Sequence, residues 1–399
     1  MSDEDRGIVS KHRVKLSSLS CFLFEKSPNH TRESKYIFYN QYKERYTGKH
    51  YLLAHRHLDQ YHKMEHFAPH PSSQFEGYYS KFRLPSGASI ALIVCTVPQA
   101  EKRPHMVSFS YVSKDSKHVF QRELWADHLQ MVPHAHNAFD LRVPGIGNIK
   151  VHSDSTSEYT FDTDDFSFHG NTTSRTAWSE TTETPESLLV YLPLPLHWHV
   201  QSLSSDCDFD LSIPSDPNLP SEDKKGTATV HQEKNWANSF PSAHIWVQAR
   251  TRTSGICIAG GKILGMEAYL AGYRSSKPQY SMDWRPPLAL RVAYLSPSMS
   301  VSNNWDERSF EMTLQTWTQK MVVKAQAPKG TFFSLSSPFA DGHRENFLGQ
   351  SFAATITVQV YEAGLLSAWQ LKHEERFEHG SLEFGGGYYP PAGTDQRSH

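Results

Sequence analysis

The chain has 399 residues, a length typical of two domains. Its 40 Lys and Arg residues nearly balance 42 Asp and Glu residues, and the net charge of -2 argues against a partner such as nucleic acid or an anionic membrane surface. Hydrophobic residues make up 38% of the chain and aromatic residues 12%, which is enough to build a core and excludes a globally disordered protein.

Two sequence features bear on the cellular location of the protein. The longest apolar stretch, 88–97, is much shorter than the ~20 residues that a membrane-spanning helix needs. The chain opens Met-Ser-Asp-Glu-Asp-Arg, with acidic residues where a signal peptide has its basic region. We therefore expect a cytoplasmic protein without a membrane span.

Short β-rich runs, separated by Gly, Pro, Ser, Asn and Asp, recur along the chain, whereas helical periodicity is scarce. This spacing favours antiparallel barrels or sandwiches over a fold in which strands and helices alternate. In chain order, the expected strands are 36–39, 75–83, 88–97, 106–112, 118–124, 158–162, 197–203, 226–231, 244–250, 256–264, 267–273, 290–295, 310–316, 321–325, 350–361 and 368–377. The sequence thus predicts an all-β protein with little helix.

A polar, turn-rich segment at 213–225 divides the chain into nearly equal halves and is the best candidate for a linker. Each half contains enough expected strands for an antiparallel β domain of its own. We therefore predict an N-terminal extension at 1–34, an N-terminal β domain at 35–215 and a C-terminal β domain at 226–389.

The four cysteines are far apart in the sequence and form neither a CxxC motif nor a Cys/His spacing typical of metal sites. Cys95 and Cys257 lie in apolar, strand-like runs, where a buried free thiol is expected. A single disulfide that involves two of Cys21, Cys95, Cys207 and Cys257 is the alternative.

The most informative strand is 244–250, because both of its faces carry large side chains. Alternation places Ile245, Val247 and Ala249 on one face, and His244, Trp246, Gln248 and Arg250 on the other. Trp, His and Gln together are unusual on a solvent-exposed face but typical of a cavity wall. We expect this face to line a pocket; packing against a neighbouring domain is the alternative.

The segment just before this strand places an acid, a base, an amide and an indole on four consecutive residues: Glu233, Lys234, Asn235 and Trp236. Trp236 favours burial of the segment, and buried Glu and Lys side chains must be paired or hydrogen-bonded. Two interpretations remain open, namely a catalytic role and a salt bridge that fixes the domain junction.

Strand 197–203 places His197, His199 and Gln201 on one face. Two histidines at i and i+2 can ligate a metal, but no nearby carboxylate and later histidine complete such a site in the sequence. We therefore expect hydrogen-bonded pocket or interface histidines and no metal. No Gly-rich phosphate loop, nucleophile elbow or HExxH motif occurs either.

Residues 233–248, Glu-Lys-Asn-Trp-Ala-Asn-Ser-Phe-Pro-Ser-Ala-His-Ile-Trp-Val-Gln, resemble the EKNWG-x-x-FP-x-x-W-x-W-x-Q signature of the tocopherol cyclase family. Residues 75–82, Phe-Glu-Gly-Tyr-Tyr-Ser-Lys-Phe, resemble the FEGWY-type strand of that family, and 199–206 and 378–386 fall where further family blocks are expected. Ala237 and His244 depart from the long signature, so the tocopherol reaction itself is not what we expect.

The resemblance implies two lipocalin-like β-barrel domains and a hydrophobic pocket for prenylated or polyketide substrates, with neither a metal nor a redox cofactor. Among the relatives, the chain is most similar to fungal hetero-Diels–Alderases of tropolonic sesquiterpenoid pathways. This similarity implies that a hydroxymethyl tropolone or phenol is dehydrated to an o-quinone methide, which a humulene-type alkene captures.

For this reaction, we expect His244 or His199 to donate a proton and Glu233 to orient the donor or accept a proton. Trp236 and Trp246 are expected to form walls, and Gln248 or Arg250 to hold a substrate oxygen. The remaining expected substrate-binding residues are Asn235, Lys234, Tyr79, His197 and Trp284. Two other functions remain open: a prenyl-phenol cyclase that protonates an alkene, and a non-catalytic carrier of a hydrophobic intermediate.

Overall fold

The computed structural model describes residues 67–179, 182, 184–238, 240–293, 295–364 and 367–390. The expected extension at 1–34, the expected strand at 36–39 and Cys21 lie outside these residues. All of the described residues belong to one compact unit.

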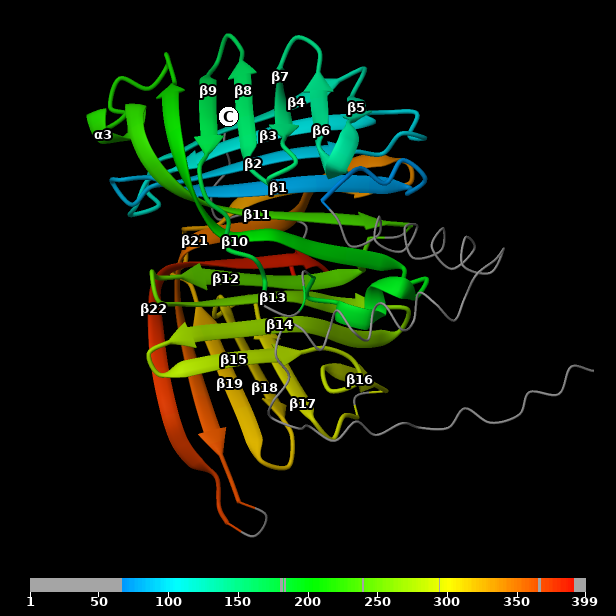
Figure 1. Ribbon diagram of the computed structural model, residues 1–399, viewed down its shortest axis with the longest axis vertical. Coiled ribbons are helices and arrows are strands. Elements are labelled where there is room, and N and C mark those ends of the chain that lie inside the picture. The colour runs from blue at the N-terminus through cyan, green and yellow to red at the C-terminus, as the bar shows by residue number, and fades with distance from the viewer. Residues whose placement is uncertain are drawn as a thin grey trace, which may run out of the picture. The chain divides into compact units, whose positions relative to one another are not determined.

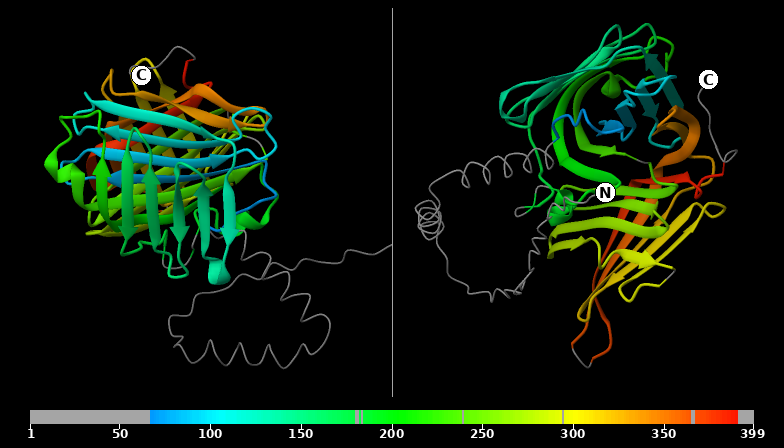
Figure 2. Two further views of the ribbon diagram at one scale, coloured as in Figure 1. Left: turned by 90° about the horizontal axis from the view of Figure 1, so that it is seen from above. Right: turned by 90° about the vertical axis from the view of Figure 1, so that its right-hand side faces the viewer.

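The first sheet contains eleven antiparallel strands and curls around its own core (Figures 1 and 2). Its order across the sheet is β4-β3-β2-β1-β11-β10-β9-β8-β7-β6-β5, so β11, the last of these strands in chain order, pairs with β1, the first. The strands are β1 Phe75–Arg83, β2 Ser89–Thr96, β3 His105–Val112, β4 Val119–Ala126, β5 Gln130–Pro133, β6 Phe139–Val143, β7 Gly147–Val151, β8 Ser157–Asp162, β9 Ser167–Thr172, β10 Leu196–Ser212 and β11 Lys225–Ala237.

The second sheet also has eleven strands, and β12–β15 cross β17–β19 and β21 so that the sheet folds back on itself (Figure 1). The central order is β15-β14-β13-β12-β22-β21-β19-β18-β17, while β16 pairs with β14 and β20 with β21. The strands are β12 Ala243–Arg250, β13 Ser254–Ile263, β14 Met266–Ser276, β15 Gln279–Trp284, β16 Leu290–Val292, β17 Met299–Asn304, β18 Ser309–Gln315, β19 Gln319–Gln326, β20 Phe333–Phe339, β21 Gly342–Glu362 and β22 Gln370–Gly386.

Helix is limited in the described residues to three short segments: η1 Ala135–Asn137, η2 Ser187–Tyr191 and α3 Ser221–Lys224. The predicted all-β fold is therefore confirmed, as two large antiparallel sheets of lipocalin-like type. Strands β5, β6, β7, β9, β15, β17 and β20 were not predicted, because most of them are short or carry Gly, Asn and Ser within the strand.

The polar segment at 213–225 joins β10 to β11, which pair with each other in the same sheet. Asp210 pairs with Lys225 at one end of this ladder and Leu196 with Ala237 at the other. The change from the first sheet to the second therefore comes later, between Ala237 and Ala243. The division of the chain into domains at 215 and 226 remains a prediction, but β11 belongs with the N-terminal sheet.

Aromatic side chains fill the inside of the first sheet. Phe109 stacks on Phe166 with ring centroids 4.1 Å apart, and Phe82 contacts Phe168 edge to face at 4.9 Å. Large rings of this kind remove much apolar surface from water, which is the main stabilising contribution to a β core. The inner face of β1 and β11 contacts this aromatic core, and their outer face packs against the second sheet.

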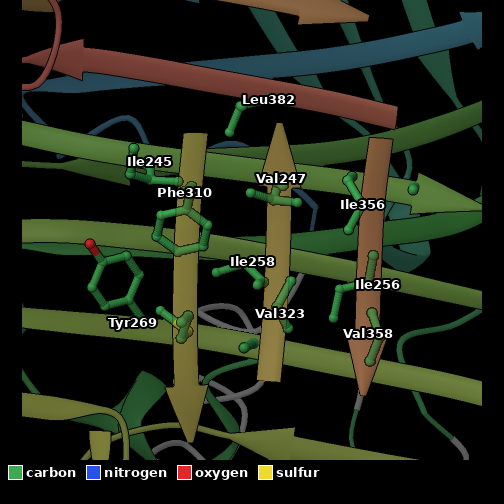
Figure 3. Packing of buried hydrophobic residues seen from close by; sticks show 14 of the residues in the cluster. Ile245, Val247, Ile256, Ile258, Tyr269, Phe310, Val323, Ile356, Val358 and Leu382 are labelled. Carbon is green, nitrogen blue, oxygen red and sulfur yellow. The ribbon is translucent and has the colours of Figure 1, made fainter. Parts of the chain in front are cut away.

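The inside of the second sheet is mainly aliphatic, and Figure 3 shows its centre. Ile245 and Val247 of β12 lie beside Ile258 of β13, and residues of the crossing strands such as Val323 and Ile356 pack against them. The predicted inward face of β12 is thus confirmed, because Ile245, Val247 and Ala249 all belong to this core.

Truncation of Ile258, which is completely buried, is expected to destabilise the protein strongly. Ile258→Ala should lower the free energy of unfolding by about 2–5 kcal/mol, because it removes buried methyl groups and leaves a cavity. Leu264→Ala is the control, since Leu264 is 77% exposed and should change the free energy by less than about 0.5 kcal/mol. Urea unfolding of both variants measures the difference.

The outer faces of the two sheets pack against each other, and this interface contains both apolar and polar side chains. Trp198 and Val200 of β10 cluster with Cys257 of β13, and Lys81 of β1 donates a hydrogen bond to Gln248 of β12 at 3.0 Å. Figure 1 shows β1, β11 and β10 beside β12 and β13. Buried polar groups need hydrogen-bond partners, so polar side chains of the two sheets pair with one another at this interface.

Candidate active site

A cavity of about 150 Å³ lies at the interface between the two sheets. Strands β1, β2, β3, β10 and β11 of the first sheet form one side of it, and β12, β13, β20, β21 and β22 of the second sheet form the other. Aromatic walls come from Tyr79, Trp198 and Trp246. An apolar cavity of about this volume accommodates a single benzene-sized ring.

His244 lines the cavity and pairs with a carboxylate that the sequence analysis did not single out. Its Nε2 lies 2.8 Å from Oε1 of Glu383 on β22, and both side chains are nearly buried. When the neutral imidazole donates from Nε2 to this carboxylate, Nδ1 has a free lone pair. Nδ1 is buried and has no hydrogen-bond partner among the described residues.

Neighbouring groups fix the orientation of both members of this pair. Gln350 donates from Nε2 to Oε2 of Glu383 at 2.9 Å, so each carboxylate oxygen has a partner. The His244 ring lies over Gly385, where only a glycine leaves room for it. Phe240 contacts the ring edge to face, with centroids 5.3 Å apart. The geometry is that of a carboxylate-oriented histidine, which can act as a general base and then as a general acid.

The close approach at position 385 gives a direct test of this arrangement. A Cβ there would lie 2.5 Å from Nε2 of His244 and closer still to other ring atoms, so the ring must move. Gly385→Ala is expected to lower kcat by about 10²-fold, because a displacement of about 1 Å costs that much in an oriented site. Gly364→Ala, where the nearest atom is the Ser367 hydroxyl, is the control and should retain full activity in the same assay.

Trp246 forms a wall of the cavity, and its ring is held by a hydrogen bond to Glu233. The indole Nε1 donates to Oε2 of Glu233 at 3.1 Å, and Nε2 of His231 lies 2.9 Å from the same oxygen. Tyr79 contacts Trp246 edge to face at 5.2 Å. Glu233 therefore positions an aromatic wall, whereas the orienting partner of His244 is Glu383.

The Tyr79 hydroxyl is the neutral donor best placed at the cavity. Burial raises the pKa of Tyr79 well above its usual range, and the nearby carboxylates of Glu383 and Glu233 raise it further. The hydroxyl thus remains protonated, and its contact with Oε1 of Gln350 is long, at 3.4 Å. Such a weakly held donor is able to turn to a ligand oxygen.

Lys234 borders the cavity, but its ammonium pairs with Glu76 inside the first sheet. The Nζ atom also lies 2.8 Å from Nδ1 of His70 and 3.2 Å from the hydroxyl of Tyr78. Burial would raise the pKa of Glu76, but attraction to Lys234 and contacts with His70 lower it to about 2. Lys234 thus forms a salt bridge, but the pair with Glu76 lies within the first sheet and does not fix the junction between the two sheets.

Three further expected site residues lie on the inner face of the first sheet, away from the cavity. His197 pairs with Glu186 at 2.8 Å and stacks on Trp236 with ring centroids 5.0 Å apart. His199 is buried near Phe67, with ring centroids 6.4 Å apart. Alternation along β10 and β11 explains this outcome, because Trp198 and Glu233 face the second sheet. We leave these three residues out of the proposed site.

The second sheet also separates the expected residues into two groups. Trp284 lies in its aliphatic core, and neither Gln248 nor Arg250 lines the cavity. Gln248 accepts a hydrogen bond from Lys81, which also donates to Ser381. Asn235, in contrast, lies at the cavity with Tyr79 and Trp246. Gln248 and Arg250 are therefore not placed to hold a ligand oxygen in this cavity, whereas the Tyr79 side chain lines it.

Glu383, Gln350, Trp198 and Lys81 were not predicted from the sequence as site residues. Glu383 lies within the 378–386 block that resembles the family, and it follows the apolar residue Leu382 in an alternating strand. This alternation alone could have placed it on the face opposite Leu382. Its pairing with His244, 139 residues earlier, depends on the ladder between β12 and β22 and leaves no local signal in the sequence.

Comparisons with known proteins concern the fold of the chain. No protein-family model matches the chain, and no curated protein sequence matches it. Among solved structures, kievitone hydratase from Nectria haematococca matches with a TM-score of 0.50 at 10% identity, over 81% of this chain and 92% of that chain. At this identity, the likeness shows the shared two-sheet fold.

Two other solved structures match with lower TM-scores. CghA with Sch210972 has a TM-score of 0.48 at 10% identity, over 78% of this chain and 88% of that chain. A putative AttH from Nitrosomonas europaea has a TM-score of 0.45 at 12% identity, over 81% and 95% of the two chains.

The described residues contain no helix with the length and apolar character that a membrane crossing requires.

Proposed function

We propose that the protein is an enzyme of hydrophobic small-molecule metabolism whose active site is the cavity between the two sheets. The observation that carries this proposal is the pair His244 and Glu383, which places a buried, unpartnered imidazole nitrogen at an aromatic-walled cavity. The reaction that we assign is dehydration of a hydroxymethyl phenol or tropolone to an o-quinone methide, followed by a stereoselective hetero-Diels–Alder addition of a humulene-type alkene.

The dehydration needs only one proton-transfer group, because the ring hydroxyl and the hydroxymethyl group are neighbours on the substrate. Nδ1 of His244 takes the proton of the ring hydroxyl, and the resulting imidazolium is stabilised by Glu383. Nδ1 then gives this proton to the departing hydroxyl, which leaves as water. One C–O bond breaks, a ring C=O and an exocyclic C=C form, and no oxidant or reductant is consumed.

The cycloaddition itself moves no proton and depends on the relative position of two π systems. Correct positioning contributes up to ~7–11 kcal/mol in favourable intramolecular reactions. Tyr79, Trp198 and Trp246 supply flat, rigid walls, and the Tyr79 hydroxyl can donate to the oxygen on which charge develops. The cavity volume fits the ring of the first substrate, so the terpene is expected to enter as the surrounding side chains move apart.

This proposal is consistent with the resemblance of residues 233–248 to the tocopherol cyclase signature. Kievitone hydratase, which shares the fold, is by its name a hydratase, and hydration is the reverse of the water loss proposed for this chain.

Two alternative functions would use the same cavity. A prenyl-phenol cyclase would use the same histidine to protonate an alkene. The carrier would bind the intermediate in the same cavity without accelerating a reaction.

Reaction in D₂O separates the three functions. Full-length protein is incubated with a hydroxymethyl tropolone and a humulene-type alkene, beside a boiled sample. The proposal predicts faster product formation than in the boiled sample, with no deuterium on carbon. Carbon-bound deuterium would instead indicate alkene protonation by a cyclase. A product rate equal to the background, together with tight product binding, would indicate a carrier and contradict the proposal.

A further inference from the structure

A second group of buried polar side chains lies beside the cavity, on strands β11 and β13. One ligand atom each of His231, Glu233 and Cys257 lies within 4.8 Å of the other two. The residues are 3%, 8% and 1% exposed. We propose that these three side chains bind a divalent transition-metal ion, with Zn²⁺ as the best match. The proposal is independent of the catalytic role assigned to His244.

The donor set is the one that zinc prefers, namely an imidazole nitrogen, a thiolate sulfur and a carboxylate oxygen. In a tetrahedral zinc site with bonds of about 2.0–2.3 Å, ligand atoms are separated by about 3.3–3.8 Å. The three atoms are within 4.8 Å here, so small side-chain movements bring them to an ion. Three protein ligands leave the fourth position to water or to a molecule in the cavity that Glu233 lines.

The imidazole of His231 presents Nε2 to the other ligands, since Nε2 lies 2.9 Å from the Glu233 carboxylate. Nε2 is therefore the nitrogen that binds the ion, and the ring proton then resides on Nδ1. Nδ1 is buried and has no hydrogen-bond partner among the described residues.

The charges also match a divalent ion. A Cys257 thiolate and the Glu233 carboxylate carry two negative charges together. On binding, the thiol proton of Cys257 passes to the buffer, and bonds from sulfur, nitrogen and oxygen replace bonds from the ion to water. The neighbouring ammonium of Lys81 hydrogen-bonds to Gln248 and Ser381, and within the described ranges no ion pair joins it to Glu233.

The linear sequence conceals this site, because its ligands come from two different sheets. His231 and Glu233 are two residues apart and share one face of β11, as His197 and His199 share one face of β10. Cys257 reaches them only because β13 packs across the interface. The absence of a Cys/His spacing motif is therefore compatible with a metal site at this position.

Cobalt titration of the full-length protein tests the proposal. The protein is treated with EDTA, dialysed and titrated with Co²⁺, and the near-ultraviolet sulfur-to-cobalt charge-transfer band is recorded. We expect the band to saturate at one equivalent and to disappear on addition of Zn²⁺. Cys257→Ser should abolish it. Cys207→Ser, which alters another buried free cysteine, should retain it.

Two further variants keep the test decisive if Cys257→Ser does not fold. His231→Gln should weaken Co²⁺ binding at least tenfold, and Lys81→Met should strengthen it, because a neighbouring positive charge is removed. The melting temperature without metal checks the folding of each variant. No charge-transfer band at one equivalent, or a band that survives in folded Cys257→Ser, would overturn the proposal whatever the catalytic assays show.

Discussion

Replacement of His244 with glutamine is expected to lower kcat for the dehydration step by about 10²–10⁴-fold, the usual contribution of a general acid or base. Glutamine has a similar size but cannot carry the ring-hydroxyl proton to the leaving group. His169→Gln is the matched control, because His169 is exposed and pairs with exposed Asp162. Single-turnover formation of the product, with the substrate prebound, measures the chemical step.

The role of Glu383 is tested in the same assay. Glu383→Gln removes the charge that stabilises the imidazolium and also offers Nε2 an amide donor, so the opposite ring tautomer is favoured. We expect kcat to fall by about 10²-fold or more, with a much smaller change in KM. A rise in KM of about 10²-fold with unchanged kcat would show that Glu383 only contributes to substrate binding.

The largest effect on stability is expected at Lys234. Its side chain is completely buried, so Lys234→Met leaves the Glu76 carboxylate buried without its ammonium partner. Removing one member of a buried pair costs about 3–5 kcal/mol of unfolding free energy. Lys225→Met breaks an exposed pair with Asp210 and should cost less than about 1 kcal/mol. Urea unfolding at neutral pH compares the two.

The double variant Glu76→Gln/Lys234→Met separates charge from packing. It removes the uncompensated carboxylate, so part of the lost unfolding free energy should return. A double variant no more stable than Lys234→Met would show that the ammonium acts through packing and not through its charge. Coupling energies from such cycles are the direct measure of the pair.

The same pair predicts a pH dependence. The folded-state pKa of Glu76 is about 2, below its ordinary value of 4.5, so its stabilising contribution is fully present above about pH 4.5. The contribution is lost as the pH falls towards 2. Burial lowers the pKa of Lys234 from 10.5 to about 8, so the unfolding free energy should rise between these two values as the pH increases. Both trends should be weaker in the double variant.

Much of the fold could be predicted from the sequence, because strand alternation is a local property. The inner and outer faces of β12 are as expected, since Ile245 and Val247 enter the core while His244 and Trp246 face the other sheet. The short strands β5 and β17 were missed, because their stability comes from pairing with neighbours and not from bulky apolar side chains.

The site was less predictable, because its geometry depends on which faces meet. His197 and Trp236 have the residue types of a site, yet they pack on the inner side of the first sheet. Glu383 and Gln350 have unremarkable local sequences, but strand pairing brings them to His244. The resemblance to the tocopherol cyclase signature indicated the correct stretch of chain, and the sheet register then determines which of its residues reach the cavity.

We expect the cavity between the two sheets to catalyse a stereoselective addition. Chiral chromatography of the product from hydroxymethyl tropolone and a humulene-type alkene measures this selectivity, with wild-type protein, His244→Gln and a boiled sample in parallel. Wild-type protein should form one enantiomer rapidly, and His244→Gln should react at a rate close to background. A racemic product formed at the background rate by the wild-type protein would contradict this expectation.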